Sequence, residues 1–525
     1  MITFANVTPR EVGIPDETIQ KLIARLARRQ IPMHSLLILR HDKLAFEGYY
    51  APVQKNTLHR LFSVTKSLTA VCIGLLEEEG KLKLSDRIVD YFPDKIPLDL
   101  DPEIGKMTIR DMLMMRTCHA STTYKIDMKT DWVQSFFSVK STHPAGTLFH
   151  YDTSSAHVLA ALVERLSGME MMAYVRKKLE PVGFSRKDTI LRDPFDSPIG
   201  GSGWVGTSED LLRFGHFLLR KGNVGGEQLL SEDFLNTALS LQSSTMATAQ
   251  VPGEACGYGY MFWISESGTP FCYGLGGQYI FLYPELDLVV VTTADDIGLG
   301  GGNQQIYDAV REELIEPLQR LQEKEKPDEQ GWRHLIGVAS GTGEADSGKP
   351  ILGASAEASS AKGGRPLKSA PADMKKLAQS LTLLTPIGDA GSSLMSMTQT
   401  HLQKKTFRFD PNPMGFTDMQ LSWVKDVGTL HYTLKGQKCD LSFGMGRHVT
   451  KYFPGYNQFY AGDGIWLADG SLYLYFHIID AYVGNVRMQF SFDENRVTVF
   501  LKKNEESLFT EYQGHLVGWC TSSQS

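Results

Sequence analysis

The sequence has few cysteines, no long apolar run and no cluster of basic residues. Its six cysteines are dispersed over 525 residues, so the disulfide framework of a small secreted domain is not expected. No stretch approaches about 18 consecutive apolar residues, the length of a membrane-spanning helix. A net charge of −7 without any basic run argues against an extended nucleic-acid surface. We therefore expect no nucleic-acid partner and no membrane span.

Several motifs of metal, phosphate and hydrolytic chemistry are also absent. There is no Cys-x-x-Cys, His-Glu-x-x-His or Walker loop, so we expect neither a metal nor a cofactor. A Gly-x-Ser-x-Gly elbow is missing, which argues against an ordinary α/β-hydrolase. A strand–glycine loop–helix order over residues 288–322 is superficially typical of a dinucleotide site, but it occurs once and lacks the third glycine spacing. The first residues show no signal-peptide pattern, and with the dispersed cysteines this predicts a cytoplasmic protein.

The most informative segment is Ser63-Val64-Thr65-Lys66, which opens an amphipathic helical run that ends near Gly80. A serine and a lysine three residues apart on a helix project from the same face, about one turn apart. This spacing brings an amine within reach of a hydroxyl, which is a poor nucleophile until a base takes its proton. A lysine acts as that base only where burial or nearby positive charge lowers its pKa. The helix start also offers unpaired backbone N–H groups to a developing oxyanion.

The same Ser-x-x-Lys spacing occurs twice more and needs to be separated from the first. Ser359 and Lys362 lie in a Gly/Ala/Ser-rich stretch with no helix, whereas Ser422 and Lys425 lie in an alternating, strand-like segment. Only Ser63 opens a helix. A serine at a helix start is also a common N-cap, so the nucleophile and the cap remain alternative interpretations of Ser63.

Five blocks follow one another along residues 10–320. The first block joins residues 61–66 and 80–86, and the second covers residues 107–113. The third joins residues 144–147 and 151–153, and the last two cover residues 206–211 and 274–278. Together these blocks resemble the serine β-lactamase and penicillin-binding-protein-like hydrolases, in particular the class C β-lactamase-related branch. The resemblance implies an α/β (α+β) β-lactamase/transpeptidase-like fold, in which a mainly antiparallel sheet is flanked by helices and joined by a helical subdomain.

The resemblance also implies a role for each motif residue. Ser63 would attack a carbonyl and become acylated, and Lys66 would act as general base or proton relay. Tyr151 would pass a proton to the leaving group and activate the water of deacylation, although an aromatic packing residue is the alternative interpretation. Thr153, expected to contact the substrate, stands where β-lactamases usually carry asparagine.

The third motif carries no positively charged residue. The best register places Leu275, Gly276 and Gly277 where β-lactamases have a lysine or histidine, a hydroxyl residue and a glycine, and Gln278 follows. We expect the backbone N–H of Gln278 to complete an oxyanion hole with that of Ser63, with Gly277 beside it. The missing cation argues against penicillin-like carboxylates and favours the esterase and amide-hydrolase members, such as 6-aminohexanoate-dimer hydrolases. A plain hairpin is the alternative interpretation of this segment.

Composition divides the chain into three parts. Residues 1–325 form the expected hydrolase domain, and residues 326–374 read as a flexible Gly/Ala/Ser-rich linker. Residues 375–525 alternate apolar and polar residues between turns, which predicts an all-β barrel or sandwich of about eight strands. This part resembles accessory C-terminal domains of some family members, and its aromatic residues either pack in the core or line a groove.

These observations lead to one preferred function. We expect a serine hydrolase that cleaves an ester or amide bond of a small molecule or short peptide through a Ser63 acyl-enzyme, with Lys66 and Tyr151 as general base and acid. The sequence leaves the oligomeric state open. The alternatives are a β-lactamase or D-amino-acid peptidase with the same chemistry, and a non-catalytic binding protein on the same fold.

Overall fold

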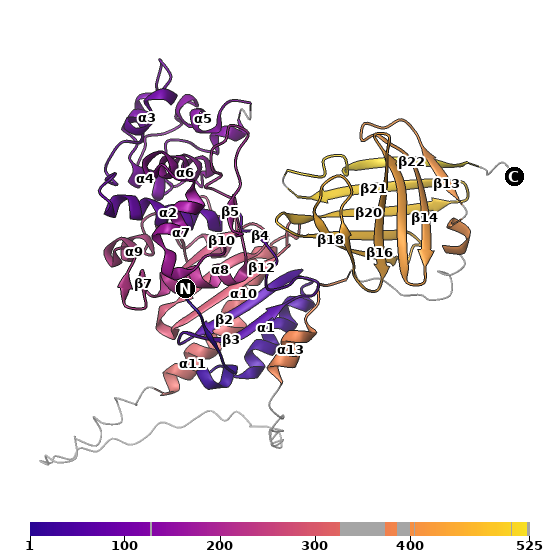
Figure 1. Cartoon of the computed structure of the whole chain (residues 1–525), viewed down its shortest axis with the longest axis horizontal. Coiled ribbons are helices and arrows are strands. Elements are labelled where there is room, and N and C mark those ends of the chain that lie inside the picture. The colour runs from indigo at the N-terminus through magenta and orange to yellow at the C-terminus, as the bar shows by residue number, and fades with distance from the viewer. Residues whose placement is uncertain (127–128, 326–372, 386–398, 404, 506, 522–525) are drawn as a thin grey trace, which may run out of the picture.

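The structure is a computed structural model that describes residues 1–126, 129–325, 373–385, 399–403, 405–505 and 507–521. It consists of an N-terminal α/β part and a C-terminal β-barrel (Figure 1). The expected linker lies outside the described residues except for Asp373 and Met374 at its end, and the Ser359/Lys362 pair lies wholly outside them.

A seven-stranded sheet forms the centre of the α/β part. Its order is β1-β3-β2-β12-β11-β10-β9, and every neighbouring pair is antiparallel except β1 with β3. All residues of β2 and β12 are buried, as expected for central strands covered on both faces. The strands are β1 (Ala5–Asn6), β2 (Met33–Arg40), β3 (Lys43–Tyr49), β9 (Trp263–Ile264), β10 (Pro270–Gly274), β11 (Gln278–Tyr283) and β12 (Leu288–Ala294).

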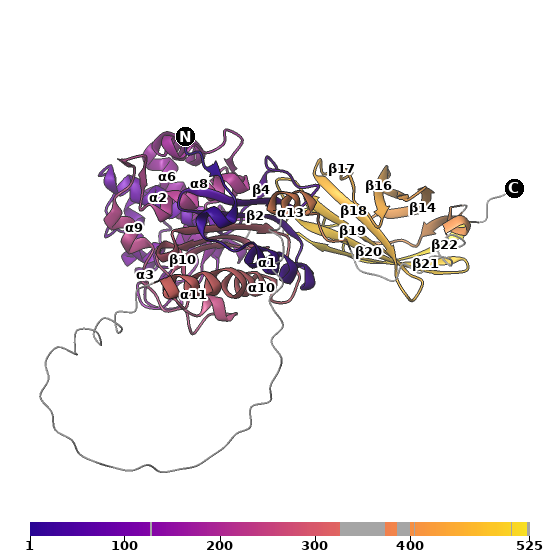
Figure 2. The same cartoon turned by 90° about the horizontal axis from the view of Figure 1, so that it is seen from below.

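Helices cover both faces of the sheet (Figure 2). One face carries α1 (Asp16–Arg28), α10 (Gly302–Val310) and α11 (Glu316–Glu325), and the other carries α2 (Val64–Glu78) and α8 (Ser208–Leu219). A π-helical turn, Arg311–Ile315, joins α10 to α11, so the helix that ends the strand–loop–helix order over residues 288–322 is not a continuous α-helix. A Cβ on Gly215 of α8 would lie 2.7 Å from Ile280 and Val289 side chains, so this helix packs closely on β11 and β12.

The chain between β3 and β9 is mainly helical, as the sequence predicts. The two longest helices of this region, α2 and α6 (Thr153–Ser167), pack against each other. Besides these and α8, the helices of this region are α3 (Pro102–Lys106), α4 (Ile109–Leu113), α5 (Trp132–Ser138), α7 (Met171–Lys178) and α9 (Glu232–Ala238). Two small sheets accompany them, formed by β4 (His59–Arg60), β5 (Thr189–Ile190) and β6 (Trp204–Gly206), and by β7 (Asn223–Val224) and β8 (Glu227–Gln228).

The C-terminal part is a closed barrel and not a sandwich. Nine strands close into a ring because β16 pairs with β18 as well as with β15, and the short β17 pairs with β18 outside that ring. Ser422 lies in a strand, as expected, and its hydroxyl is bonded to His431. The strands are β13 (Thr406–Phe409), β14 (Phe416–Val424), β15 (Val427–Leu434), β16 (Gln437–Met445), β17 (Val449–Tyr452), β18 (Phe459–Trp466), β19 (Leu472–Ile479), β20 (Val483–Asp493), β21 (Arg496–Asn504) and β22 (Gly514–Thr521).

Alternating burial along the barrel strands produces a separate apolar core. Phe453, Tyr460 and Trp466 are buried in it, whereas Tyr452 is exposed, so core packing is the role of most of these aromatic residues. The short helix α13 (Met374–Ser380) belongs to the apolar core of the α/β part. It packs on β3, where a Cβ on Gly48 would lie 2.6 Å from Leu381.

Candidate active site

Ser63 lies directly before α2, after a residue with an unusual backbone conformation. Phe62 has a φ of 46°, in the left-handed region that bulky residues rarely adopt. The Thr65 hydroxyl donates a 2.6 Å hydrogen bond to the Phe62 carbonyl oxygen and holds this turn. The Ser63 side chain makes no capping hydrogen bond to the helix. Ser63 therefore occupies the N-cap position of α2 without capping the helix through its side chain, and its hydroxyl faces other groups.

Lys66 lies one helical turn along and faces Ser63, as the spacing predicts. Its Nζ donates to Ser63 Oγ at 2.9 Å and to the carbonyl oxygen of Gly201 at 2.6 Å, and its side chain is almost completely buried. A Cβ on Gly201 would come within 2.3 Å of the Thr153 methyl carbon, so only glycine lets this carbonyl approach so closely. The lysine is thereby fixed between a backbone carbonyl and the serine.

Tyr151 completes a cluster of three side chains. Its phenol lies beside the Ser63 hydroxyl, and Lys66 Nζ lies 4.9 Å from the centre of its ring. The ring stacks on Trp263 with centroids 5.5 Å apart. Burial raises the pKa of the phenol above its ordinary value, and the hydrogen bond from Ser63 acts in the opposite direction. Tyr151 is thus a neutral phenol near neutral pH and can donate a proton.

Asp152 is a buried charged neighbour of this cluster that the sequence analysis did not select. It is the N-cap of α6, where its Oδ1 accepts a 2.8 Å hydrogen bond from the Ser154 N–H. Burial raises the pKa of Asp152 to about 6, while the bonds from Ser154 and the charge of Lys66 lower it. Its position at a helix start is the only sequence signal it carries, and that signal indicates a cap.

Thr153 is not part of the pocket beside Ser63. Its methyl group faces Gly201, and its backbone N–H donates to the Thr122 hydroxyl at 3.1 Å. Thr153 therefore lies behind Lys66, where it supports the segment that carries the Gly201 carbonyl.

Strand β10 passes directly beside Ser63 at Gly274. A Cβ on this residue would lie 2.2 Å from the Leu61 carbonyl oxygen and 3.2 Å from the Ser63 backbone nitrogen. Only glycine permits this approach without a shift of the backbone. The next residue, Leu275, lines the pocket next to Ser63.

Gly277 and Gln278 lie on the far side of the β10–β11 turn. A Cβ on Gly277 would contact Ile306 at 2.5 Å, and the buried Gln278 amide donates to the Leu275 and Ala294 carbonyl oxygens at 3.1 and 2.7 Å. Neither residue lines the pocket. The chain turns over residues 275–277, so the residues after the turn pack on β12 and α10.

A cavity of about 230 Å³ opens beside Ser63. Aromatic side chains and one carboxylate dominate its wall, and no lysine, arginine or histidine belongs to its lining among the described residues. The lining consists of Ser63, Phe149, Tyr151, Thr248, Ala249, Gln250, Glu254, Trp263, Tyr273 and Leu275.

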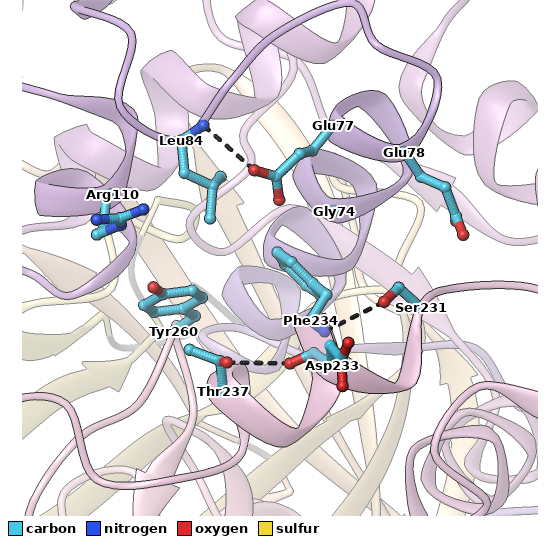
Figure 3. A pocket seen from close by; sticks show the side chains of 10 residues that line it. All are labelled: Gly74, Glu77, Glu78, Leu84, Arg110, Ser231, Asp233, Phe234, Thr237 and Tyr260. Carbon is cyan, nitrogen blue, oxygen red and sulfur yellow. Dashed lines mark hydrogen bonds between the residues drawn. The ribbon is translucent and has the colours of Figure 1, made fainter.

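A second cavity, of about 540 Å³, lies at the other end of α2 (Figure 3). Its hydroxyl groups are engaged locally, since Ser231 accepts a hydrogen bond from the Phe234 N–H and Thr237 donates to the Asp233 carbonyl. Glu77 in its wall is fourteen residues from Ser63, which corresponds to about 20 Å along a helix. This cavity lacks a paired hydroxyl and amine, so the cavity beside Ser63 is the stronger candidate for the active site.

Comparison with known proteins shows the family of the chain. Residues 18–296 match the sequence model of the Beta-lactamase family. The chain belongs to the Beta-lactamase family. It is a serine hydrolase related to β-lactamases and penicillin-binding proteins, and the resemblance inferred from the five sequence blocks is confirmed. In the described residues, no group of three or more His, Cys, Asp or Glu side chains is arranged to hold a metal ion. No helix in the same ranges is both long and apolar enough to cross a membrane.

Individual relatives differ in the functions that their names state. The 6-aminohexanoate-dimer hydrolase of Paenarthrobacter ureafaciens is 25% identical over 323 residues, which is 55% of this chain and 82% of the relative. A family VIII carboxylesterase structure is 14% identical with a TM-score of 0.44, covering 57% of this chain and 99% of its own. The octameric penicillin-binding protein homologue from Pyrococcus abyssi is 14% identical with a TM-score of 0.45. This match covers 95% of this chain and 99% of that homologue.

Proposed function

We propose that this chain hydrolyses an ester or amide bond through an acyl-enzyme formed on Ser63. The observation that carries the proposal is the position of the Ser63 hydroxyl, which accepts a 2.9 Å hydrogen bond from Lys66 Nζ and lies beside the phenol of Tyr151 at the wall of the same cavity. A serine placed between a base and a neutral acid has the two proton routes that acyl transfer needs. The cavity of about 230 Å³ suits a small molecule or the end of a short peptide.

In the acylation step, Ser63 Oγ attacks the substrate carbonyl carbon. Its proton passes to the unprotonated amine of Lys66 across the 2.9 Å contact. The tetrahedral intermediate then collapses as the Tyr151 hydroxyl gives its proton to the leaving oxygen or nitrogen, and Lys66 returns a proton to Tyr151. Water repeats the sequence on the acyl-enzyme and releases the acid.

The oxyanion needs two donors beside Ser63. We assign the Ser63 backbone N–H, which has no partner within the described residues, and the Leu275 backbone N–H. The close approach of Gly274 to the Ser63 nitrogen supports Leu275 in place of the expected Gln278. Preorganised donors of this kind are typically worth 10²–10³-fold in rate each.

We further propose that the enzyme works in the cytoplasm. All six cysteines are unpaired, as expected in a reducing compartment. No partner other than the substrate is needed for the proposed reaction.

The proposal is tested by labelling with a fluorophosphonate probe and measuring intact mass. The wild type should gain one adduct, and Ser63→Ala should gain none. Lys66→Met and Tyr151→Phe should lower p-nitrophenyl ester turnover by about 10²–10⁴-fold, the usual contribution of a general base or acid. Lys83→Met and Ser138→Ala change exposed residues outside the pocket and serve as matched controls. A folded wild type that takes no adduct would exclude the mechanism and favour a non-catalytic binding protein.

A further inference from the structure

The barrel contacts the α/β part at two places that lead to the candidate active site (Figure 1). One is the loop after β12, where Asn485 Nδ2 of β20 donates a 2.7 Å hydrogen bond to the Asp295 carboxylate, and both side chains are fully buried. The other is strand β4, where the guanidinium of Arg60 lies 5.9 Å from the centre of the Tyr482 ring. Each contact leads to a segment that carries one of the two backbone N–H groups assigned to the oxyanion.

The loop after β12 is bonded to the β10–β11 turn. The Gln278 side-chain amide donates to the carbonyl oxygen of the last β12 residue at 2.7 Å and to the Leu275 carbonyl oxygen at 3.1 Å. The backbone N–H of Asp296 donates to the Gly276 carbonyl oxygen at 3.3 Å. Asp295 lies between these two points of attachment. The position of the Leu275 N–H therefore depends on where Asp295 is held.

Close packing joins the same loop to the barrel. A Cβ on Gly298 of the loop would lie 2.6 Å from the Asn504 side chain of the barrel. On the other side, a Cβ on Gly276 of the turn would lie 3.3 Å from Ile297 of the loop. Closely packed interiors transmit displacements, so a movement of the barrel passes through the loop to the turn.

The second contact reaches the segment directly before Ser63. The Arg60 guanidinium lies 4.8 Å from the centre of the Phe62 ring, so the same cation contacts one ring from each part. Such cation–ring contacts are attractive and more so where water is excluded. Phe62 has the left-handed backbone conformation described above, and a conformation of this kind persists only where surrounding contacts fix it. Tyr482 of the barrel is one of the groups that fix it.

We propose that Asn485 and Tyr482 of the barrel position the two backbone N–H donors of the oxyanion hole. Asn485 acts through the loop after β12 on the Leu275 N–H, and Tyr482 acts through Arg60 on the Ser63 N–H. This inference rests on the proposed function of Ser63. It gives the barrel a role in the reaction, although no described barrel residue lines the cavity beside Ser63.

The first test exchanges the two partners of the buried hydrogen bond. Asn485→Asp sets two carboxylates against each other and should slow fluorophosphonate labelling of Ser63 by about 10-fold or more, since complete loss of one oxyanion donor costs about 10²–10³-fold. Ester turnover should fall in kcat with little change in KM, because the cavity wall is untouched. Adding Asp295→Asn restores an amide opposite a carboxylate and should recover most of the lost rate. Asn495→Asp adds the same charge at an exposed turn of the barrel and should label like the wild type.

Tyr482→Leu tests the second contact without burying a new charge, so this arm does not depend on the folding of Asn485→Asp. It removes the ring beside Arg60 and should slow labelling by about 10-fold, less than the loss of a whole donor. Phe500→Leu is the matched control, because it makes the same kind of change at an exposed position of the barrel.

Hydrogen–deuterium exchange separates this inference from the proposed mechanism. Asn485→Asp should exchange faster over residues 271–283 and Tyr482→Leu over residues 59–66, with the other segments of the α/β part unchanged. These changes in a folded protein whose wild type takes no adduct would exclude the mechanism while supporting the positioning by the barrel. A labelled wild type, with both variants labelling and exchanging at the same rates, would overturn the inference alone.

Discussion

Asn485 of the barrel donates a 2.7 Å hydrogen bond to Asp295, the residue that follows the central strand β12. Both side chains are fully buried, and His477 of the barrel lies 3.5 Å from the same carboxylate. His477 also lies beside His34 of β2, with ring centroids 6.1 Å apart. A buried carboxylate is stable only with partners, so the barrel supplies polar partners that the sheet of the α/β part needs.

Replacing Asn485 should therefore destabilise both parts together. Asn485→Leu leaves the Asp295 carboxylate without its donor, and the expected loss is about 1–3 kcal/mol in the free energy of unfolding. Urea denaturation followed by intrinsic fluorescence measures it. Asn495→Ala, at an exposed turn of the barrel, is the control and should change the free energy by less than about 0.5 kcal/mol. Equal stabilities of the two variants would show that this contact does not couple the parts.

A methyl group at Gly274 should displace β10 from the nucleophile. Gly274→Ala puts a Cβ 2.2 Å from the Leu61 carbonyl oxygen, so the strand that carries the Leu275 N–H must move. We expect fluorophosphonate labelling of Ser63 to slow by about 10²–10³-fold, the usual cost of losing one oxyanion donor. Gly300→Ala is the control, since a Cβ there meets no atom within 4 Å. Unchanged labelling of Gly274→Ala would remove Leu275 from the oxyanion hole.

The contact between the Ser63 and Lys66 side chains could be predicted, because helical spacing is local and fixes which side chains share a face. Tyr151 was found through the order of the five blocks. The place of the third motif was not predictable in the same way, because the turn over residues 275–277 decides whether Gly274 or Gly277 meets Ser63. That turn depends on packing against β12 and α10, which the local sequence does not encode.

Two further features depend on contacts between distant segments. Glu254 reaches the cavity from a loop that carries no recognisable motif, so only the folded chain shows it beside Tyr273. Alternating strands are equally consistent with a sandwich and a barrel. The closing β16–β18 pair, Gly444 with Asp463 and Met445 with Gly464, joins strands that are separated by β17, and it decides between the two.

A cation at Leu275 should change which substrates the enzyme accepts. The Leu275 side chain is 43% exposed at the cavity wall, so Leu275→Lys should be tolerated in the fold. The new ammonium would neutralise part of the Glu254 charge and attract a substrate carboxylate. We expect kcat/KM for a chromogenic cephalosporin to rise about 10-fold. Leu275→Met, which is neutral and of similar size, should leave it unchanged. Equal cephalosporin rates for both variants would contradict this role of position 275.

Replacing Asp152 should alter the dependence of stability on pH. Burial raises the pKa of this carboxyl from 3.8 to about 6, so the folded state holds the proton more tightly than the unfolded chain. This contribution to stability is complete below about pH 4 and is lost as the pH rises through about 6, and it amounts to about 3 kcal/mol. Asp152→Asn cannot ionise, yet its side-chain oxygen can still accept from the Ser154 N–H.

The free energy of unfolding of Asp152→Asn should therefore fall less than that of the wild type between about pH 4 and 6. Urea titrations at several pH values in this range measure the difference. Asp233→Asn, at an exposed position at the start of α9, should follow the wild-type curve. Parallel curves for Asp152→Asn and the wild type would show that Asp152 is not held protonated by the fold, and that its negative charge is fully balanced beside Lys66.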